Sequence, residues 1–201
     1  MYDKDGMRKI DAQSVYLGNR EPDYLIGITN DLKYSGFSLS FMFDIRIGGD
    51  VLNLTKAFML SRGTDGSLEE HRNQSMLFDG VIETGDGQFV KNDKKVILDQ
   101  YFYNAYYLHA GENFVEDASW TRLRYITMSY DLPKSITKKL KIKGLKLSLT
   151  GRNLLLFTKY SGGDPETNYF GSGLGGTGTA GLDYFNVPAT RAIEFTLKSS
   201  F

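Results

Sequence analysis

Apolar and polar side chains alternate over long stretches of this chain, and this pattern constrains its fold most. From 37 to 47, all six odd positions are apolar, whereas only Met42 is apolar among the five even positions. Successive side chains of a β-strand point to opposite faces of a sheet, so the alternation indicates strands with one apolar and one polar face. The same pattern recurs at 24–34, 145–157 and 193–201.

The first two alternating stretches are separated by Ser35 and Gly36. A short turn of this composition between two such stretches predicts a tight β-hairpin. A further stretch, 120–131, is less regular, because Arg122 and Arg124 share the parity of its apolar residues. Either a β-bulge redirects the face of this strand, or its arginine end protrudes beyond the apolar zone.

The connections between the predicted strands differ greatly in length. One is the short turn within 33–37 and one is the moderate segment 132–144, but about seventy residues follow position 48, and 161–188 forms a second long, glycine-rich insert. Compact soluble domains rarely contain such inserts, whereas outer-membrane β-barrels have short periplasmic turns and long external loops. The chain is accordingly divided into an acidic lead-in (1–23), a barrel hairpin (24–47), a long extracellular loop (48–117), two barrel strands with a periplasmic turn (118–160), a glycine-rich extracellular loop (161–187) and a C-terminal barrel strand (188–201).

Composition excludes several classes of protein. The chain has 24 Lys and Arg against 24 Asp and Glu, which gives no basic surface for nucleic acid. It has no cysteine and only two histidines, so disulfide frameworks and Cys or His metal cages are ruled out. No apolar run is long enough for a transmembrane helix, and the first residues are not a signal peptide. Either an export signal lies upstream, or the protein is a soluble all-β domain.

That soluble alternative stays open at this point. In a β-sandwich the same apolar parity would face a dry core, and alternation alone does not distinguish a core from lipid. A soluble all-β carbohydrate-binding module is therefore the second functional hypothesis. Burial of Phe41, Leu147 and Phe195 together in a two-layer interior would favour it over the barrel.

Three segments stand out: ASWTRLRYITMSYDLPKS from Ala118, TGRNLLLFTKYSGGDPE from Thr150 and GLDYFNVPATRAIEFTLKSSF, which closes the chain. They resemble the C-terminal region of the SusC/RagA family of TonB-dependent outer-membrane transporters. The stretch YLGNREPDYLIGITNDLKYSGFSLSFMFDIRIGGDV is also similar to a hairpin of that family, and FDGVIETGDGQFVKN resembles part of its large external loop. The resemblance extends over nearly the whole chain.

The resemblance implies a 22-stranded barrel around an N-terminal plug, in the bacterial outer membrane. Such a transporter imports glycans or peptides with a SusD-like surface lipoprotein and is energised through a TonB complex. The five strands predicted here are fewer than the roughly eight that close the smallest transmembrane barrel. The chain is therefore expected to be an antiparallel segment of a larger barrel, and neither to fold stably nor to transport alone. The nutrient is not encoded in any readable motif.

The C-terminal strand carries Phe195, Leu197 and Phe201 on one parity. Terminal aromatic strands of this kind resemble the signal that the outer-membrane assembly machinery reads by strand addition. Alternatively, Phe201 is only a lipid-facing or interfacial aromatic residue, and this role is compatible with an assembly signal.

Near the N-terminus, Asp3, Asp5 and Asp11 surround Gly6 in a pattern similar to a calcium loop. If Gly6 is its sixth position, Met1 and Ala12 stand where two oxygen ligands belong, so the loop is degenerate or is an acidic turn without metal. No other cofactor is expected.

Five aromatic residues lie late in the long loop: Tyr101, Phe102, Tyr103, Tyr106 and Tyr107. They would either contact a ligand or the lipoprotein, or pack the loop against itself.

Arg122, Arg124 and Arg152 are interpreted as lumen charges that pair with Asp44, Glu194 or a plug. The five lysines of 134–143 either meet anionic lipid or form a solvated turn. No pair of carboxylates has a defined spacing, so the chain is not predicted to be an enzyme.

Overall fold

The computed structural model describes residues 1–10, 13–85, 87–166 and 181–201. The chain forms two compact units. The sheet unit contains Asn19–Asp50, Asn186–Phe201 and, of the segment between them, 117–166. The second, here called the helical unit, contains the described residues of 1–18, 51–116 and 181–185.

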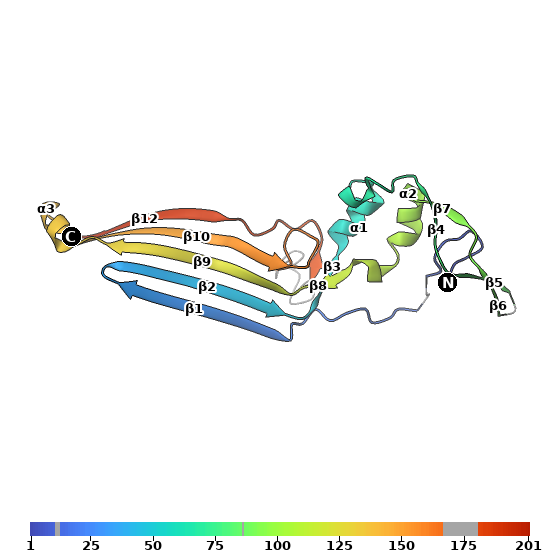
Figure 1. Ribbon diagram of the computed structural model, residues 1–201, viewed down its shortest axis with the longest axis horizontal. Helices are drawn as coiled ribbons and strands as arrows, with labels where there is room; N and C mark the ends of the chain where they lie inside the picture. The colour runs from blue at the N-terminus through green and yellow to red at the C-terminus, as the bar shows by residue number, and fades with distance from the viewer. Residues whose placement is uncertain (11–12, 86, 167–180) are drawn as a thin grey trace. The chain divides into compact units, whose positions relative to one another are not determined.

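The sheet unit is built on one five-stranded antiparallel sheet in the order β1-β2-β9-β10-β12, in which the strands lie side by side (Figure 1). Its strands are β1 (Tyr24–Tyr34), β2 (Phe37–Ile47), β9 (Trp120–Asp131), β10 (Gly144–Thr158) and β12 (Ala192–Ser200). A short helix, α3 (Lys134–Lys139), lies in the connection between β9 and β10. The five alternating stretches of the sequence are thus strands, and the predicted fold class, an antiparallel segment of a β-barrel, is confirmed.

The turn between β1 and β2 is the predicted tight hairpin. Tyr34 pairs with Phe37, so only Ser35 and Gly36 form the loop, with φ angles of 46° and 87°. Two consecutive positive φ angles identify a type I′ turn, whose twist matches that of the flanking strands. Glycine is favoured at position 36, because its φ angle is left-handed and a Cβ atom would lie 3.2 Å from the carbonyl oxygen of Asp131.

A β-bulge at Arg124 settles the irregular pattern of β9. Met42 of β2 pairs with Tyr125 but Phe43 pairs with Leu123, so Arg124 is left without a counterpart. The extra residue shifts the parity of β9 by one, which puts Leu123 on the same face as Phe43. Of the two alternatives that the sequence left open, redirection of the face by a bulge is the one that the structure has.

On the other side of β9, the neighbouring strand β10 accommodates the bulge with two extra residues. Arg152 pairs with Tyr125 and Leu155 pairs with Leu123, so Asn153 and Leu154 have no counterpart. Two residues preserve parity, which is why Leu155 remains on the face of the earlier leucines of β10 although Leu154 and Leu156 blur the sequence pattern. Asn153 has a φ angle of 51°, in the left-handed region that asparagine tolerates.

The helical unit has helices and small sheets where the sequence predicts a long loop. Its helices are α1 (Leu54–Ser61), the 3-10 turns η1 (Gly66–Leu68) and η3 (Gly111–Phe114), α2 (Gln100–Phe102) and the π-turn η2 (Tyr103–Tyr107). Its strands are β3 (Asp50–Asn53), β8 (Val115–Asp117) and β11 (Leu182–Asp183) in one sheet, β4 (Ser75–Leu77) with β7 (Lys95–Ile97), and β5 (Val81–Gly85) with β6 (Gln88–Lys91). No helix in the described ranges is long and apolar enough to cross a membrane.

Two small cores hold the helical unit together. One joins Ala57 and Leu60 of α1 to Leu68 and Phe114, and the other contains Val96, Leu98 and Phe102. The Asn53 side chain caps α1 by accepting a hydrogen bond from the backbone N–H of Lys56 at 2.9 Å. The described part of the segment 48–117 is therefore internally packed.

Candidate functional site

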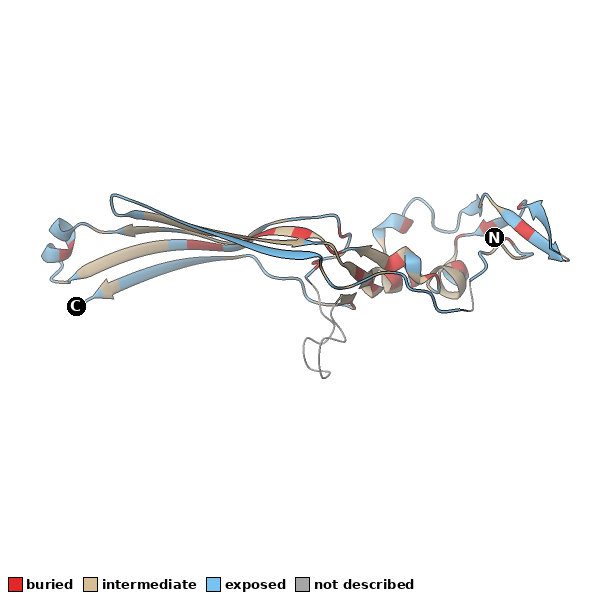
Figure 2. Ribbon diagram, turned by 90° about the horizontal axis from the view of Figure 1, so that it is seen from below, coloured by how far each residue is buried: buried red, intermediate tan, exposed pale blue. Residues whose placement is uncertain are grey.

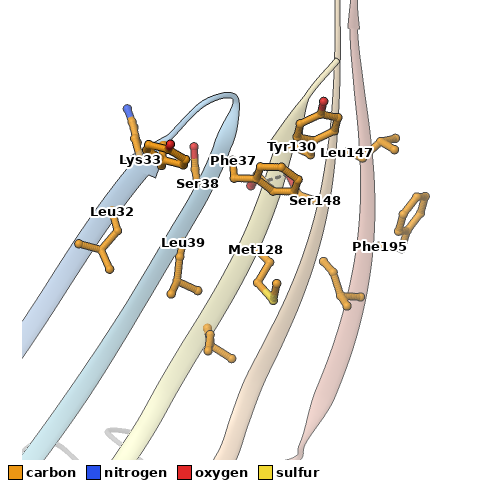
Figure 3. Close-up of a pocket in the computed structure, with 14 residues that line it drawn as sticks. Leu32, Lys33, Phe37, Ser38, Leu39, Met128, Tyr130, Leu147, Ser148 and Phe195 are labelled. Atoms are coloured by element: carbon orange, nitrogen blue, oxygen red, sulfur yellow. Dashed lines mark hydrogen bonds between the residues drawn. The ribbon is translucent and has the colours of Figure 1, made fainter. Parts of the chain in front are cut away.

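The apolar face of the sheet unit is its most distinctive surface. It carries one apolar side chain from each strand in a row, such as Leu32, Leu39, Met128, Leu149 and Phe195, which adjoin a hollow of ≈ 680 Å³ (Figure 3). Leu39, Met128, Leu149 and Phe195 are direct partners in the strand register. The row shows that the predicted parity is continuous across β2, β9, β10 and β12.

These apolar side chains are not covered. Phe195 keeps 69% of its surface exposed and Met128 keeps 60%, and the sheet in Figure 2 is intermediate or exposed along most of its length. The buried residues of the five strands are Trp120, Arg122, Leu123, Thr150 and Gly151. Within the described part of the sheet unit no second layer covers the apolar face, so the face has no dry interior of the kind that a soluble sandwich needs.

The opposite, polar face carries hydroxyl and charged side chains. Ser148 donates to Ser129 at 3.0 Å, and the hydroxyls of Thr127 and Thr150 lie 2.9 Å apart across the same two strands. Further along β10, Arg152 Nε donates to Glu194 Oε1 of β12 at 2.7 Å. The pairing of Arg152 with Glu194 is one that the sequence analysis proposed.

A cluster of charged residues lies on this polar face at the bulge. This arginine cluster consists of Arg122 and Arg124 of β9, Asp44 of β2, and Asp164 and Glu166 of the segment that follows β10. Arg124 Nε donates to Asp44 Oδ2 at 2.8 Å, and its two Nη atoms donate to the two carboxylate oxygens of Glu166 at 2.7 and 2.6 Å. Such bidentate, charge-assisted contacts fix geometry as well as adding energy. The guanidinium also lies 5.1 Å from the ring centre of Trp120.

The most buried contact of the cluster joins Arg122 to Asp164. Their side chains are 2% and 8% exposed, and Arg122 Nη2 donates to Asp164 Oδ1 at 2.5 Å. Asp164 also accepts hydrogen bonds from the backbone N–H groups of Glu166 and Ala189, each at 3.0 Å. One carboxylate therefore ties β9 to the segments on both sides of the undescribed residues 167–180.

Opposing effects act on the pKa of Asp164. Burial alone would raise it, but the N–H donors of Ala189 and Glu166 and the Arg122 guanidinium stabilise the carboxylate, and the net result is a pKa below the usual value. Asp164 is thus ionised at neutral pH. Asp44 and Glu194 were the carboxylates predicted to pair with the arginines. Asp164 and Glu166 were not predicted as partners, although both lie in the motif YSGGDPE.

The aromatic segment of the helical unit is divided by the structure. Phe102 is buried and stacks on Phe78 with ring centres 5.8 Å apart. Tyr101 is 63% exposed and packs edge to face with Tyr106, at 5.9 Å between ring centres. Tyr103 and Tyr107 are half-buried and pack edge to face at 5.6 Å, and burial together with Tyr107 raises the pKa of the Tyr103 phenol.

A small hollow of ≈ 150 Å³ adjoins this aromatic segment. It is lined by Tyr2, Arg8, Phe78, Phe102, Tyr106, Tyr107, Ala110 and Asn113. The Arg8 guanidinium forms an ion pair with Glu112. Packing and an accessible aromatic wall therefore coexist in this segment, and the two predicted roles of its tyrosines both remain predictions.

The predicted calcium ligands lie in a tight turn. Asp3 Oδ1 accepts hydrogen bonds from the backbone N–H groups of Asp5 and Met7, both at 2.9 Å, and Gly6 has a φ angle of 80°. Asp11 lies outside the described residues. Within the described ranges no group of three or more Asp, Glu or His side chains is arranged to hold a metal ion, so calcium binding stays a prediction.

The predicted assembly residues lie at an edge of the sheet. Phe195 and Leu197 are exposed on β12, whose partner in the described sheet is β10 on one side. Phe201 follows the strand and is 81% exposed. Backbone groups along the outer edge of β12 are placed where a further strand would pair.

Known proteins resemble this chain in sequence and in fold. No protein-family model matches the chain. TonB-dependent receptor P3 of Formosa agariphila is 30% identical over 201 residues, which cover 99% of this chain and 18% of that protein. TonB-dependent receptor P26 of the same organism is 27% identical over 197 residues, covering 98% of this chain and 19% of the receptor. The chain thus spans less than a fifth of the length of these relatives.

Solved structures of a peptide importer share the fold. The RagAB peptide importer in its "open-open" state matches 90% of this chain and 17% of its own, with a TM-score of 0.59 and 22% identity. A further structure of the RagAB peptide transporter matches the same share with a TM-score of 0.58 and 23% identity. The resemblance to TonB-dependent transporters that the sequence motifs predicted is confirmed over nearly the whole chain by these receptors, and the RagAB structures share its fold.

Proposed function

We propose that this chain forms part of the barrel wall of a TonB-dependent transporter in the bacterial outer membrane. The observation that carries this proposal is the pair of unlike faces on one uncovered sheet. The apolar face presents side chains such as Phe195 to solvent, which is costly in water but favourable against lipid. The polar face, with its ion pairs, suits a water-filled lumen.

The lengths of the connections support an orientation for this wall. The two-residue β1–β2 turn and the α3 connection belong on the periplasmic side, where transmembrane barrels have short turns. The segments 48–117 and 161–187 belong outside the cell. There we propose that the exposed Tyr101 and the half-buried Tyr106 contact a nutrient or a SusD-like surface lipoprotein, which their exposure supports.

Transport is a property proposed for the whole protein and not for this segment alone. The nutrient is a peptide or a glycan, and the solved RagAB structures, described as a peptide importer, favour trying peptides first. Coupling to a TonB complex and to a plug belongs to the same proposal for the whole protein. The described residues show no arrangement that favours catalysis, and the relatives that match are named as receptors.

The two faces are tested by site-directed spin labelling of the whole protein in lipid bilayers. The chain has no cysteine, so single variants Phe195→Cys and Thr196→Cys carry one label each within it. These neighbours of β12 lie on opposite faces. We expect the label at 195 to collide preferentially with oxygen, which concentrates in lipid, and the label at 196 with a water-soluble nickel complex.

Equal access of both labels to the nickel complex would contradict the proposal and support a soluble protein. A second measurement addresses the nutrient: uptake of defined peptides and of oligosaccharides by cells with Tyr106→Ala and Tyr101→Ala variants. Reduced uptake at normal surface levels assigns these tyrosines to ligand contact, whereas normal uptake assigns them to packing.

A further inference from the structure

The short-turn end of the sheet unit gathers several chain segments. The N–H of Asp131, at the end of β9, donates to the carbonyl of Gly36 in the β1–β2 turn at 2.9 Å. The N–H of Lys143 donates to the carbonyl of Ser200, at the end of β12, at 2.8 Å. The hairpin turn, the α3 connection and the end of β12 therefore form one continuous rim.

This rim is strongly basic. The connection from Pro133 to Gly144 contains five lysines and no acidic residue: Lys134, Lys138, Lys139, Lys141 and Lys143. All five are exposed, and none makes an ion pair within the described residues. Nearby, Asp131 already has a cationic partner, since its carboxylate lies 3.6 Å from Lys146 Nζ. Five positive charges therefore remain without counter-ions in a protein whose formal net charge is zero.

Apolar side chains lie directly beside these lysines. Ile136 of α3 is 43% exposed, and Leu140, which follows one helical turn later, is 55% exposed. In a solvated turn these apolar side chains would be exposed to water, whereas a helix at a membrane surface inserts its apolar face and presents lysines to the head groups. The connection has the composition of an interfacial element.

The hollow of the apolar face lies near this rim. Its wall near the hairpin includes Tyr34 and the rings of Phe37 and Tyr130, whose centres are 4.3 Å apart (Figure 3). Aromatic side chains at the end of an apolar wall are typical of the depth at which lipid head groups begin. An acyl chain lying in the hollow would therefore have its head group at the level of the lysines.

We propose that this rim is a binding site for an anionic phospholipid, with its acyl chains in the hollow and its phosphate on the lysines. The proposal rests on the proposed function, because it requires the apolar face to be in a bilayer. Charge complementarity selects the occupant, since an array of unpaired lysines gains from an anionic head group and little from a zwitterionic one. The lysine stems also reach along apolar surface while the ammonium groups contact phosphate.

The experiment measures which lipid surrounds α3 in the whole protein, reconstituted in bilayers of phosphatidylethanolamine and phosphatidylglycerol. A fluorophore on Ser135→Cys reports on α3, and brominated forms of either lipid quench it on contact. We expect brominated phosphatidylglycerol to quench far more than its bulk share predicts. Replacing Lys138, Lys139 and Lys141 with Gln should lower this preference roughly tenfold or more, because each lysine near an anionic surface contributes to the attraction.

A matched control removes the same charge from the helical unit, with Lys4, Lys91 and Lys95 changed to Gln. It should leave the preference unchanged, and raised salt should reduce the preference of the unaltered rim through screening. Equal quenching by the two lipids, or an equal response to both triple variants, would overturn the proposal. Labels at 195 and 196 in the same samples establish separately that the sheet is in lipid, so failure of this site is distinguishable from failure of the proposed function.

Discussion

Replacing Asp164 with Asn tests whether one buried carboxylate holds the sheet and its flanking segments together. Asn keeps the size of the side chain but removes its charge, so Arg122, which is 2% exposed, loses its buried counter-ion. Breaking a buried ion pair in this way costs about 3–5 kcal/mol. Asn also replaces one acceptor oxygen with a donor, so at most one of the present contacts to Arg122 and Ala189 is retained.

Hydrogen exchange of the whole protein in detergent or bilayers measures this loss locally. The amides of Glu166 and Ala189 donate to Asp164, so their exchange reports opening of the contact. A loss of about 3–5 kcal/mol corresponds to exchange faster by a factor between about 10² and about 4 × 10³. Unchanged exchange at both amides in the Asp164→Asn variant would refute the reasoning.

The control for this experiment is Glu194→Gln, which breaks the ion pair with Arg152. Both partners of that pair are about half exposed, so water and salt compensate for most of the lost attraction. We expect little change in exchange at Glu166 and Ala189. A response as large as that of the Asp164 variant would show that the effect depends on net charge rather than on burial.

Lowering the pH should loosen the same contact. The pKa of Asp164 is depressed in the folded state, so its contribution to stability is complete above the unfolded pKa of about 3.9 and is lost as the pH falls through the lower folded pKa. Amide hydrogen exchange at Glu166 and Ala189, measured as a function of pH, detects this loss. A flat exchange profile below pH ~4 would contradict it. Gly36→Ala should cost about 1–2 kcal/mol of stability, because its φ of 87° is left-handed, and thermal unfolding checks it against the unaltered hairpin. Phe102→Ala should lower the stability of the helical unit by about 3–5 kcal/mol, whereas Tyr101→Ala should leave it nearly unchanged, and protease resistance of the two variants distinguishes them. Deleting Phe201 should reduce insertion into the outer membrane if the terminal strand is an assembly signal, and normal surface levels would remove that role.

The strands and their faces could be read from the sequence because strand periodicity is local. Alternation between 37 and 47 needs no knowledge of the neighbouring strands, and Ser35 with Gly36 defines its turn by backbone sterics alone. The resemblance to a transporter family also rested on contiguous motifs. These predictions required only information carried by adjacent residues.

The bulge and the arginine cluster were decided by tertiary structure. Whether Arg124 stays in register depends on its pairing with β2, which lies about eighty residues earlier in the chain. Likewise, Asp164 is separated by 42 residues from Arg122, and nothing in the motif that contains it specifies this partner. A charged residue has many possible partners in a sequence. The fold determines which of them is buried beside it, and a buried charge needs a partner.

The packing of the long segment 48–117 also could not be predicted from the sequence. Its helices are too short to be stable by propensity alone and are held by contacts such as those between Leu60 of α1 and Phe114. The sequence by itself determined which face of each strand is apolar, because that follows from the order of residues. Only the tertiary structure decided that no second layer covers this side in the described sheet and which charges meet on the other, because both depend on which distant segments come together.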